Sequence, residues 1–174
     1  YGGWSIVVVY ENSKMKWRDV TIFDGYAYIQ GNVVASNELL ISGFNTVKSG
    51  NVNMKLGLIA GEGDQSISGD YFEILPHDKL NLATPATTDW VRLSHNSNST
   101  TNFFNSSIPS SSPRTPTLTD NSGIDIAMFN INNTGNSLVT NEQTFTKFRY
   151  GSSQDTYIIP TIAMAVDAYV PELA

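Results

Sequence analysis

The stretch Arg18–Ile29, "RDVTIFDGYAYI", decides the class of fold. Its two halves, Arg18–Phe23 and Tyr26–Ile29, are rich in the β-branched and aromatic residues that strands favour. Between them stands the dipeptide Asp24-Gly25, a strong signal for the tight turn of a β-hairpin. We therefore predict two short antiparallel strands here, inside a chain that is made mainly of strands.

The same pattern recurs along the chain. Trp4–Tyr10, "WSIVVVY", is a continuous apolar run of strand length, which predicts a strand buried on both faces with Trp4 in the core. Thr156–Val170 predicts a long strand, in which Pro160 has to occupy a bulge, a strand start or an edge. The remaining expected strands are Glu38–Phe44, Asn53–Ala60, Tyr71–Leu75, Lys79–Leu82 and Phe145–Tyr150.

Helical patterns are nearly absent, and Asp125–Asn130 is the best of them at one turn. Many short strands separated by Gly, Asn and Pro turns are typical of β-sandwiches. We predict an all-β fold, a jelly-roll-like β-sandwich in which residues 1–174 form a single domain. Because strand-like sequence begins almost at Tyr1, we also expect the chain to be a piece of a larger multidomain protein.

One long polar loop interrupts the strands. Ser94–Gly123 consists mostly of Ser, Thr, Asn and Pro, and its section Ser110–Pro116 is expected to be flexible. The loop also contains Phe103 and Phe104, which are costly to expose to water. We therefore predict that this part of the loop folds back onto the sheet.

The composition limits the classes of partner. The formal net charge of −6 and the pI near 4.7 argue against nucleic acid and anionic membranes. Only 15% of the residues are charged. The chain has no cysteine, which excludes disulfides and thiolate metal sites. No apolar run reaches the length of a membrane span. These properties together are typical of secreted and cell-surface proteins of bacteria.

The decapeptide Gly61–Asp70, "GEGDQSISGD", concentrates three carboxylates, those of Glu62, Asp64 and Asp70. Hard oxygen ligands on a glycine-rich loop suit calcium, although the spacing is not that of an EF-hand. The alternative is a set of Asx-type turns that solvate an ordinary loop. Asp125, in a second acidic loop, completes the calcium site if both loops meet at one end of the sandwich.

Residues suited to catalysis are few. The chain has only two histidines, and they cannot form a local zinc motif. A glycosidase needs two carboxylates at a defined separation, and Glu62 with Asp64 or Asp125 is such a pair, as in any acidic β-protein. An enzyme is therefore the minor alternative. Among the aromatic side chains, Trp17 lies in a basic loop and is the best candidate for an exposed ring that contacts a ligand, and the alternative, which the sequence favours slightly, is a packing role.

Six motifs follow one another along nearly the whole chain. They are "YGGWSIVVVYEN" (1–12), "RDVTIFDGY" (18–26), "GEGDQSISGD" (61–70), "NFFNSSI" (102–108), "GIDI" (123–126) and "AMAVDAYVPEL" (163–173). The ordered set resembles a β-rich domain of large secreted bacterial surface proteins, which typically precedes tandem Ig-like repeat modules. In that family a tyrosine commonly stands where this chain has Gly61, so an aromatic role at that position does not carry over.

The resemblance implies an extracellular, adhesin-like module displayed on the bacterial cell surface, and it implies no catalytic activity. It also groups Glu62, Asp64 and Asp70 with the loop asparagines Asn102 and Asn105. This shared cluster is either a calcium site or a hydrogen-bonded network that pins the long loop.

We therefore expect a non-catalytic adhesion or ligand-binding module whose ligand is a glycan or a protein, with calcium ordering the long loop. A first alternative is a structural subunit or spacer of an extracellular fibre, joined to neighbouring domains or subunits by exchange of a terminal strand. A second alternative is a carbohydrate-active enzyme. The expected calcium ligands are Glu62, Asp64, Asp70, Asn105 and Asp125, and the expected ligand-binding residues are Trp17 and Asn102.

Overall fold

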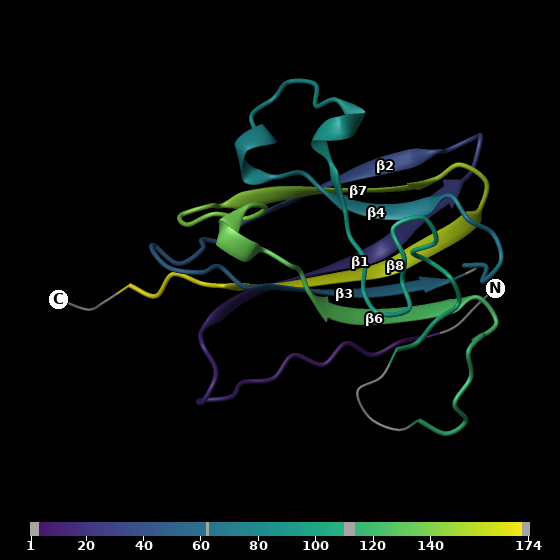
Figure 1. The fold of residues 1–174 in the computed structure, drawn as a ribbon. Coiled ribbons are helices and arrows are strands. Elements are labelled where there is room, and N and C mark those ends of the chain that lie inside the picture. Colours follow the sequence, from purple (N-terminus) through teal and green to yellow (C-terminus); the bar gives the residue numbers. More distant parts are fainter. Residues whose placement is uncertain (1–3, 62, 110–113, 172–174) are drawn as a thin grey trace.

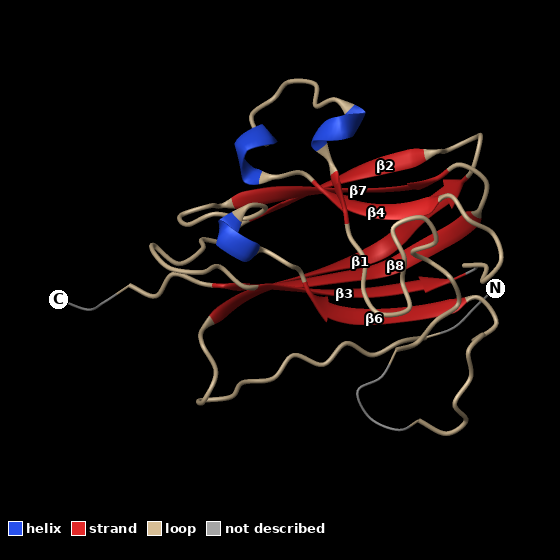
Figure 2. Cartoon of the chain, in the orientation of Figure 1, coloured by secondary structure: helices blue, strands red, loops and turns tan. Residues whose placement is uncertain are grey.

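The computed structural model describes residues 4–61, 63–109 and 114–171, which form two facing antiparallel sheets of four strands (Figures 1 and 2). Sheet A has the strand order β1-β8-β3-β6, and sheet B has the order β2-β7-β4-β5. Successive strands alternate between the sheets except at β4 and β5, which is the jelly-roll arrangement, so the predicted β-sandwich is confirmed. The strands are β1 (Arg18–Gln30), β2 (Ser36–Ser42), β3 (Met54–Gly61), β4 (Asp70–Ile74), β5 (Val91–Arg92), β6 (Ile124–Asn130), β7 (Phe145–Ser152) and β8 (Thr156–Asp167).

The core lies between the two sheets, because alternate residues of each strand point inward. In β3 the buried positions alternate with half-buried ones along the whole strand. The largest fully buried side chains are aromatic, and they come from both sheets and from the long loop. They are Phe72, Phe103, Phe104, Phe148 and Tyr157.

The predicted hairpin at Asp24-Gly25 is wrong, because β1 runs through this dipeptide as a single strand. Its partner is β8, along the entire length of β1. The register shifts where Gly25 and Tyr26 stand opposite Pro160 alone, so the dipeptide forms a β-bulge instead of a turn. Pro160 lies at this bulge, as predicted, and the missing N–H of proline is tolerated there.

The predicted strand Trp4–Tyr10 is also wrong. The segment has no regular secondary structure, and the Trp4 side chain is 87% exposed instead of buried. A strand of this composition needs neighbours on its edges and faces, and the eight strands of the sandwich leave it outside both sheets. Figure 1 shows the purple N-terminal trace running below sheet A before it turns into β1.

Two further predictions are corrected by the structure. The expected helical turn Asp125–Asn130 is part of strand β6, whose alternating burial places Asp125, Ala127 and Phe129 inside. The expected strand Lys79–Leu82 is replaced by a 3-10 turn, since Leu80 packs on Leu75 and Trp90 in a small second cluster. The other expected strands are present, with ends displaced by at most three residues.

Among the described residues, helical structure is confined to three short 3-10 turns at the periphery (Figure 2). Two of them lie between β4 and β5 and the third between β6 and β7. No helix in the described part of the chain is long and apolar enough to cross a membrane. The turns are η1 (His77–Lys79), η2 (Thr87–Asp89) and η3 (Thr134–Asn136).

Candidate functional site

Two buried carboxylates hold the long polar loop to the sandwich. Asp125 Oδ1 accepts hydrogen bonds from the backbone N–H groups of Asn105 (3.1 Å) and Ser107 (2.9 Å). Its Oδ2 accepts from the N–H of Ser106 at 2.9 Å. Asp70 Oδ2 accepts from the N–H of Phe104 at 2.5 Å. Four consecutive loop amides are therefore bound by one side chain from β4 and one from β6.

The phenylalanine pair anchors the same part of the loop, as predicted. Phe103 and Phe104 are almost fully buried. The Phe103 ring stacks on Phe72 with centroids 5.7 Å apart, and the Phe104 ring lies 4.4 Å from that of Tyr157. Aromatic contacts of this kind add about 0.5–1.5 kcal/mol each to the free energy of burial. The apolar anchor and the carboxylates thus act on adjacent residues.

Burial changes the acidity of both carboxylates. Desolvation raises the pKa of Asp70 to about 6, and the backbone N–H groups of the loop lower it in part. Desolvation also raises the pKa of Asp125 to about 6, and the neighbouring charge of Asp70 adds to the effect. A Cβ atom at Gly63 would collide with the Asp125 carboxylate and the Phe104 carbonyl, which explains the glycine in "GEGD". The acids and the loop backbone are therefore closely packed.

The structure divides the other predicted calcium ligands. Glu62 lies outside the described residues. The Asp64 side chain is exposed, and its backbone N–H donates to Asp155 Oδ2 at 3.3 Å. Asn102 and Asn105 use their Nδ2 groups as donors to the carbonyls of Gln65 and Ser97, at 3.0 and 2.6 Å. The two asparagines therefore brace the loop.

Four carboxylate and amide oxygens in this region are buried without a hydrogen-bond partner among the described residues: Asp70 Oδ1, Asn98 Oδ1, Asn102 Oδ1 and Asn105 Oδ1. Oxygen atoms of this kind suit a hard cation. Both oxygens of Asp125 accept backbone N–H groups of the loop, so this side chain already holds the loop directly, and its role as a calcium ligand stays a prediction. Across the described ranges, no group of three or more His, Cys, Asp or Glu side chains could hold a metal ion. The calcium site stays a prediction.

The opposite end of the sandwich carries a hollow beside Trp17, which we name the Trp17 hollow. Its volume is about 350 Å³. The Trp17 ring is 70% exposed, and the Lys48 Nζ lies 4.4 Å from the centre of the Tyr169 ring. Interaction with the Tyr169 hydroxyl raises the pKa of Lys48, so its ammonium group stays charged. The hollow is lined by Lys16, Trp17, Val47, Lys48, Ser49, Ala168, Tyr169 and Val170.

A buried carboxylate at the end of β8 organises this hollow. Asp167 is fully buried, and its Oδ1 lies 3.2 Å from Arg18 Nε. Its Oδ2 lies 3.8 Å from Lys16 Nζ and accepts a 2.6 Å hydrogen bond from Asn53 Nδ2. The residue next to it, Ala168, donates its N–H to the Trp17 carbonyl at 3.0 Å. Asp167 thus holds together the strands and loops that carry the hollow.

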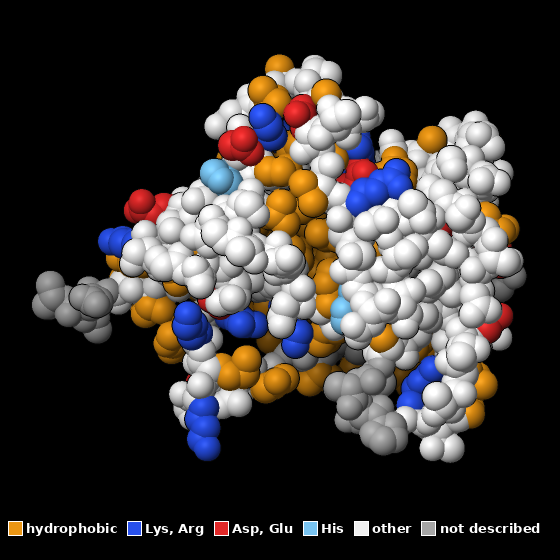
Figure 3. All heavy atoms as spheres, in the orientation of Figure 1, with side chains coloured by type: hydrophobic (Ala, Val, Ile, Leu, Met, Phe, Trp, Pro, Cys, Tyr) orange, Lys and Arg blue, Asp and Glu red, His pale blue; other side chains and the backbone are white. Residues whose placement is uncertain are grey.

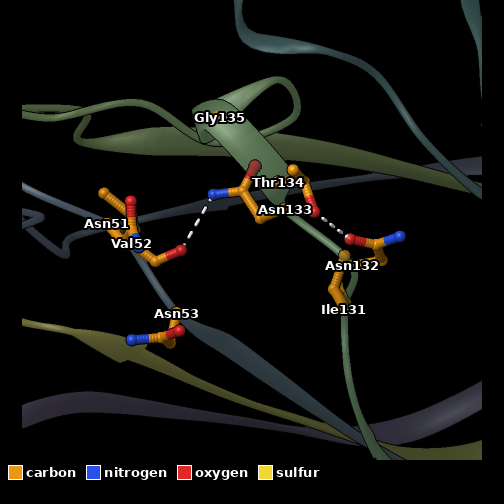
Figure 4. Close-up of a pocket in the computed structure, with 8 residues that line it drawn as sticks. All are labelled: Asn51, Val52, Asn53, Ile131, Asn132, Asn133, Thr134 and Gly135. Carbon is orange, nitrogen blue, oxygen red and sulfur yellow. Dashed lines mark hydrogen bonds between the residues drawn. The ribbon is translucent and has the colours of Figure 1, made fainter.

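A second hollow of about 290 Å³ lies nearby (Figure 4). Two hydrogen bonds join residues of its lining. Asn133 Nδ2 donates to the Val52 carbonyl at 2.9 Å, and Thr134 Oγ1 donates to Asn132 Oδ1 at 2.8 Å. The hydrogen bond between Asn133 and Val52 therefore joins the two loops that line this hollow. Its lining residues are Asn51, Val52, Asn53, Ile131, Asn132, Asn133, Thr134 and Gly135.

Sequence reasoning selected Trp17 but missed the residues around it. Lys48 and Tyr169 lie far from Trp17 in sequence, and the pairing of β1 with β8 brings the end of β8 to the start of β1. Asp167 was missed for the same reason, since its partners Arg18 and Asn53 belong to other strands or loops. A lone acid at the end of an apolar strand was the only signal in the sequence.

No protein family, curated protein or solved structure gives a match to this chain.

Proposed function

We propose that this chain is an extracellular, adhesin-like binding module of a bacterial surface protein, and that it binds a glycan in the Trp17 hollow. The observation that carries the proposal is the exposed Trp17 ring beside Tyr169 and the ammonium groups of Lys16 and Lys48. The acidic, cysteine-free composition and the resemblance described above support the extracellular location.

The chemistry of the hollow suits a sugar. A sugar ring stacks its C–H face on an exposed indole, and its hydroxyl groups bind nearby polar side chains such as Ser49. Lys16 and Lys48 bring two positive charges to one hollow of a protein whose net charge is −6, which favours a glycan with an anionic group. Among the described residues that line the hollow none is a carboxylate, and the nearby Asp167 is fully buried and ion-paired, which supports binding without glycoside hydrolysis. The alternative of a carbohydrate-active enzyme stays a prediction, because it depends on Glu62.

The test is a screen against neutral and acidic glycans, followed by titration of the best ligand with Trp17→Ala. We expect this variant to weaken binding at least about tenfold, which corresponds to about 1.4 kcal/mol, because it removes the stacking surface. Tyr26→Ala is the matched control: it truncates an equally exposed ring that lies on β1 outside the hollow. Binding that survives Trp17→Ala, or no binding to any glycan in the panel, would contradict the proposal.

We also propose that Ca²⁺ stabilises the long loop through Asp70 and the asparagines Asn102 and Asn105. The buried, unpartnered oxygens of these three side chains support it. The expected result is a higher melting temperature in calcium than in chelator for the wild type, and a smaller difference for Asn105→Ala. Identical melting curves in calcium and in chelator would contradict the calcium proposal. They would not bear on the proposal that the Trp17 hollow binds a glycan.

A further inference from the structure

The N-terminal segment Trp4–Tyr10 is an unpaired strand former. Within the described residues, its backbone makes no hydrogen bond to any other part of the chain. Its alternate side chains Ile6 and Val8 are 71% and 72% exposed. Seven residues without a charge, most of them β-branched or aromatic, have a strong tendency to join the edge of a sheet.

The edge strand β1 presents a matching set of free backbone groups. The Ala168 N–H donates to the Trp17 carbonyl, so odd-numbered residues at the start of β1 face β8. In an antiparallel ladder the direction alternates, and the N–H and C=O groups of Val20 and Ile22 therefore point to the open edge. In the part of the chain that the structure describes, these groups have no partner. Arg18–Asp24 has the same length as Trp4–Tyr10.

The other edges of the sandwich are less suited to an apolar strand. The β6 edge is partly closed, because the Ile126 N–H already donates to the Ser107 carbonyl of the long loop at 3.1 Å. The edge strand β5 has only two residues. The β2 edge is open, but it belongs to sheet B, whose outer face carries an ion-paired cluster of Glu73, Arg92 and Arg149.

The outer face of sheet A is apolar by contrast. Val20 and Ile22 of β1 are 45% and 43% exposed, and Ile126 and Met128 of β6 are exposed on the same sheet. Figure 3 shows hydrophobic side chains along part of the lower rim of the molecule, where Figure 1 places the N-terminal trace below sheet A. A new strand at the β1 edge extends this apolar surface. The apolar side chains of Trp4–Tyr10 then lie beside other apolar side chains.

We propose that the segment Trp4–Tyr10 of one molecule pairs antiparallel with Arg18–Asp24 of β1 in a second copy of the chain, as a fifth strand of sheet A. In the single chain this segment runs below sheet A without pairing, which leaves its own β1 edge open (Figure 1). Each molecule therefore carries both a donor strand and an acceptor edge. Every strand pair in sheet A is already antiparallel, so the addition keeps the geometry of the sheet. This inference does not depend on glycan binding.

Two proline variants separate donor from acceptor. Val8→Pro removes an N–H that a β-ladder needs. The backbone of this segment makes no hydrogen bond to the described strands, so the strand pairing of the sandwich stays intact. Ile22→Pro removes an N–H that points away from β8, which an edge strand tolerates. Leu40→Pro is the matched control, because Leu40 is an exposed residue of the β2 edge whose N–H also points away from its partner strand.

Light scattering during size exclusion measures the outcome at rising concentration. We expect the wild type and Leu40→Pro to associate, and Val8→Pro and Ile22→Pro to be monomers with unchanged circular dichroism. A mixture of the last two should form a one-to-one complex, since one retains the acceptor edge and the other retains the donor strand. Added salt should strengthen the association of the wild type by screening the net negative charge of the copies.

Three outcomes would overturn the proposal. One is a wild type that stays monomeric at every concentration, whether or not its segment Trp4–Tyr10 becomes protected from hydrogen exchange. Another is a Val8→Pro variant that associates as strongly as the wild type, which would assign the contact to the apolar face of sheet A. The third is a mixture of the two proline variants that remains monomeric.

Discussion

At the scale of single residues, the buried carboxylate of Asp125 has a structural role in sheet A. Its two oxygens accept three consecutive loop N–H groups, which would otherwise be buried without partners. The carboxylate is desolvated in return, and this raises its pKa to about 6. Asp125 therefore positions a loop, and its unusual acidity follows from that structural role.

The substitution Asp125→Asn tests this role. We expect it to lower the free energy of unfolding by about 1–3 kcal/mol, because an amide –NH₂ faces a loop N–H that needs an acceptor. The folded-state pKa lies above the unfolded one, so the acid stabilises the fold most below the unfolded pKa, and this contribution is lost as the pH rises through about 6. The difference between wild type and variant should therefore shrink from about pH 4 to about pH 7, by at most about 3 kcal/mol.

Urea unfolding at several pH values gives the measurement, with Asp24→Asn as the control for an exposed carboxylate. A difference that grows with pH would mean that the folded state stabilises the ionised form of Asp125.

At the scale of elements, the described parts of the long loop, residues 94–109 and 114–123, are held in place by a few contacts that the polar composition of the loop does not indicate. Phe103 and Phe104 enter the core from a stretch otherwise rich in Ser, Thr and Asn, and the Asn98 amide donates to the Phe103 carbonyl at 2.7 Å. The loop covers the open side of the sandwich beside β6, and it closes part of that edge through the Ser107 carbonyl. It is thus a structural element of the core.

Removing one ring tests the anchor. We expect Phe103→Ala to lower the free energy of unfolding by about 3–5 kcal/mol, because it leaves a cavity among Phe72, Phe104 and Phe129. Amide hydrogen exchange should also become faster in the loop than in the sheets. Phe23→Ala, at a partly buried position, is the control and should cost less. Equal losses in both variants, with no change of exchange in the loop, would contradict an anchoring role.

At the scale of the whole molecule, all eight strands of the sandwich follow the N-terminal segment in the sequence. Both sheets are complete from Arg18 onward, and residues 4–17 lie outside them. The molecule therefore has two parts with different tasks: a closed jelly roll, and an apolar segment available to a partner.

Brief digestion with trypsin tests this division. We expect early cleavage after Lys14, because that part of the chain is exposed and has no regular secondary structure. The remaining product should keep the melting temperature of the intact chain, within the roughly 2–4 °C that about 1 kcal/mol causes in a domain of this size. Mass spectrometry identifies the cut and calorimetry the transition. A much larger fall in melting temperature would mean that the segment packs on its own sandwich.

The sequence allowed most strands to be predicted, because their alternation of apolar and polar residues reflects local geometry. It did not distinguish the bulge at Asp24-Gly25 from a turn, since that choice depends on the partner strand β8 and on Pro160. Among the site residues, the exposure of Trp17 could be predicted from its basic loop, but Lys48 and Tyr169 beside it could not. The binding roles expected for Trp17 and Asp125 stay predictions. Asp167 of β8 binds Arg18 of β1 and Asn53, which directly precedes β3. No local sequence pattern predicts such a contact.

By itself, the sequence determined the class of fold and the position of the loop anchor. Strand periodicity and the cost of exposing two phenylalanines are properties of short stretches, and they hold in any arrangement of the sheets. Only the tertiary structure showed that Trp4–Tyr10 lies outside both sheets. It also showed that Trp17, Lys48 and Tyr169 meet at one hollow. The physical reason is that a strand needs an edge to pair with and a site needs residues from distant strands, and both depend on which strands become neighbours.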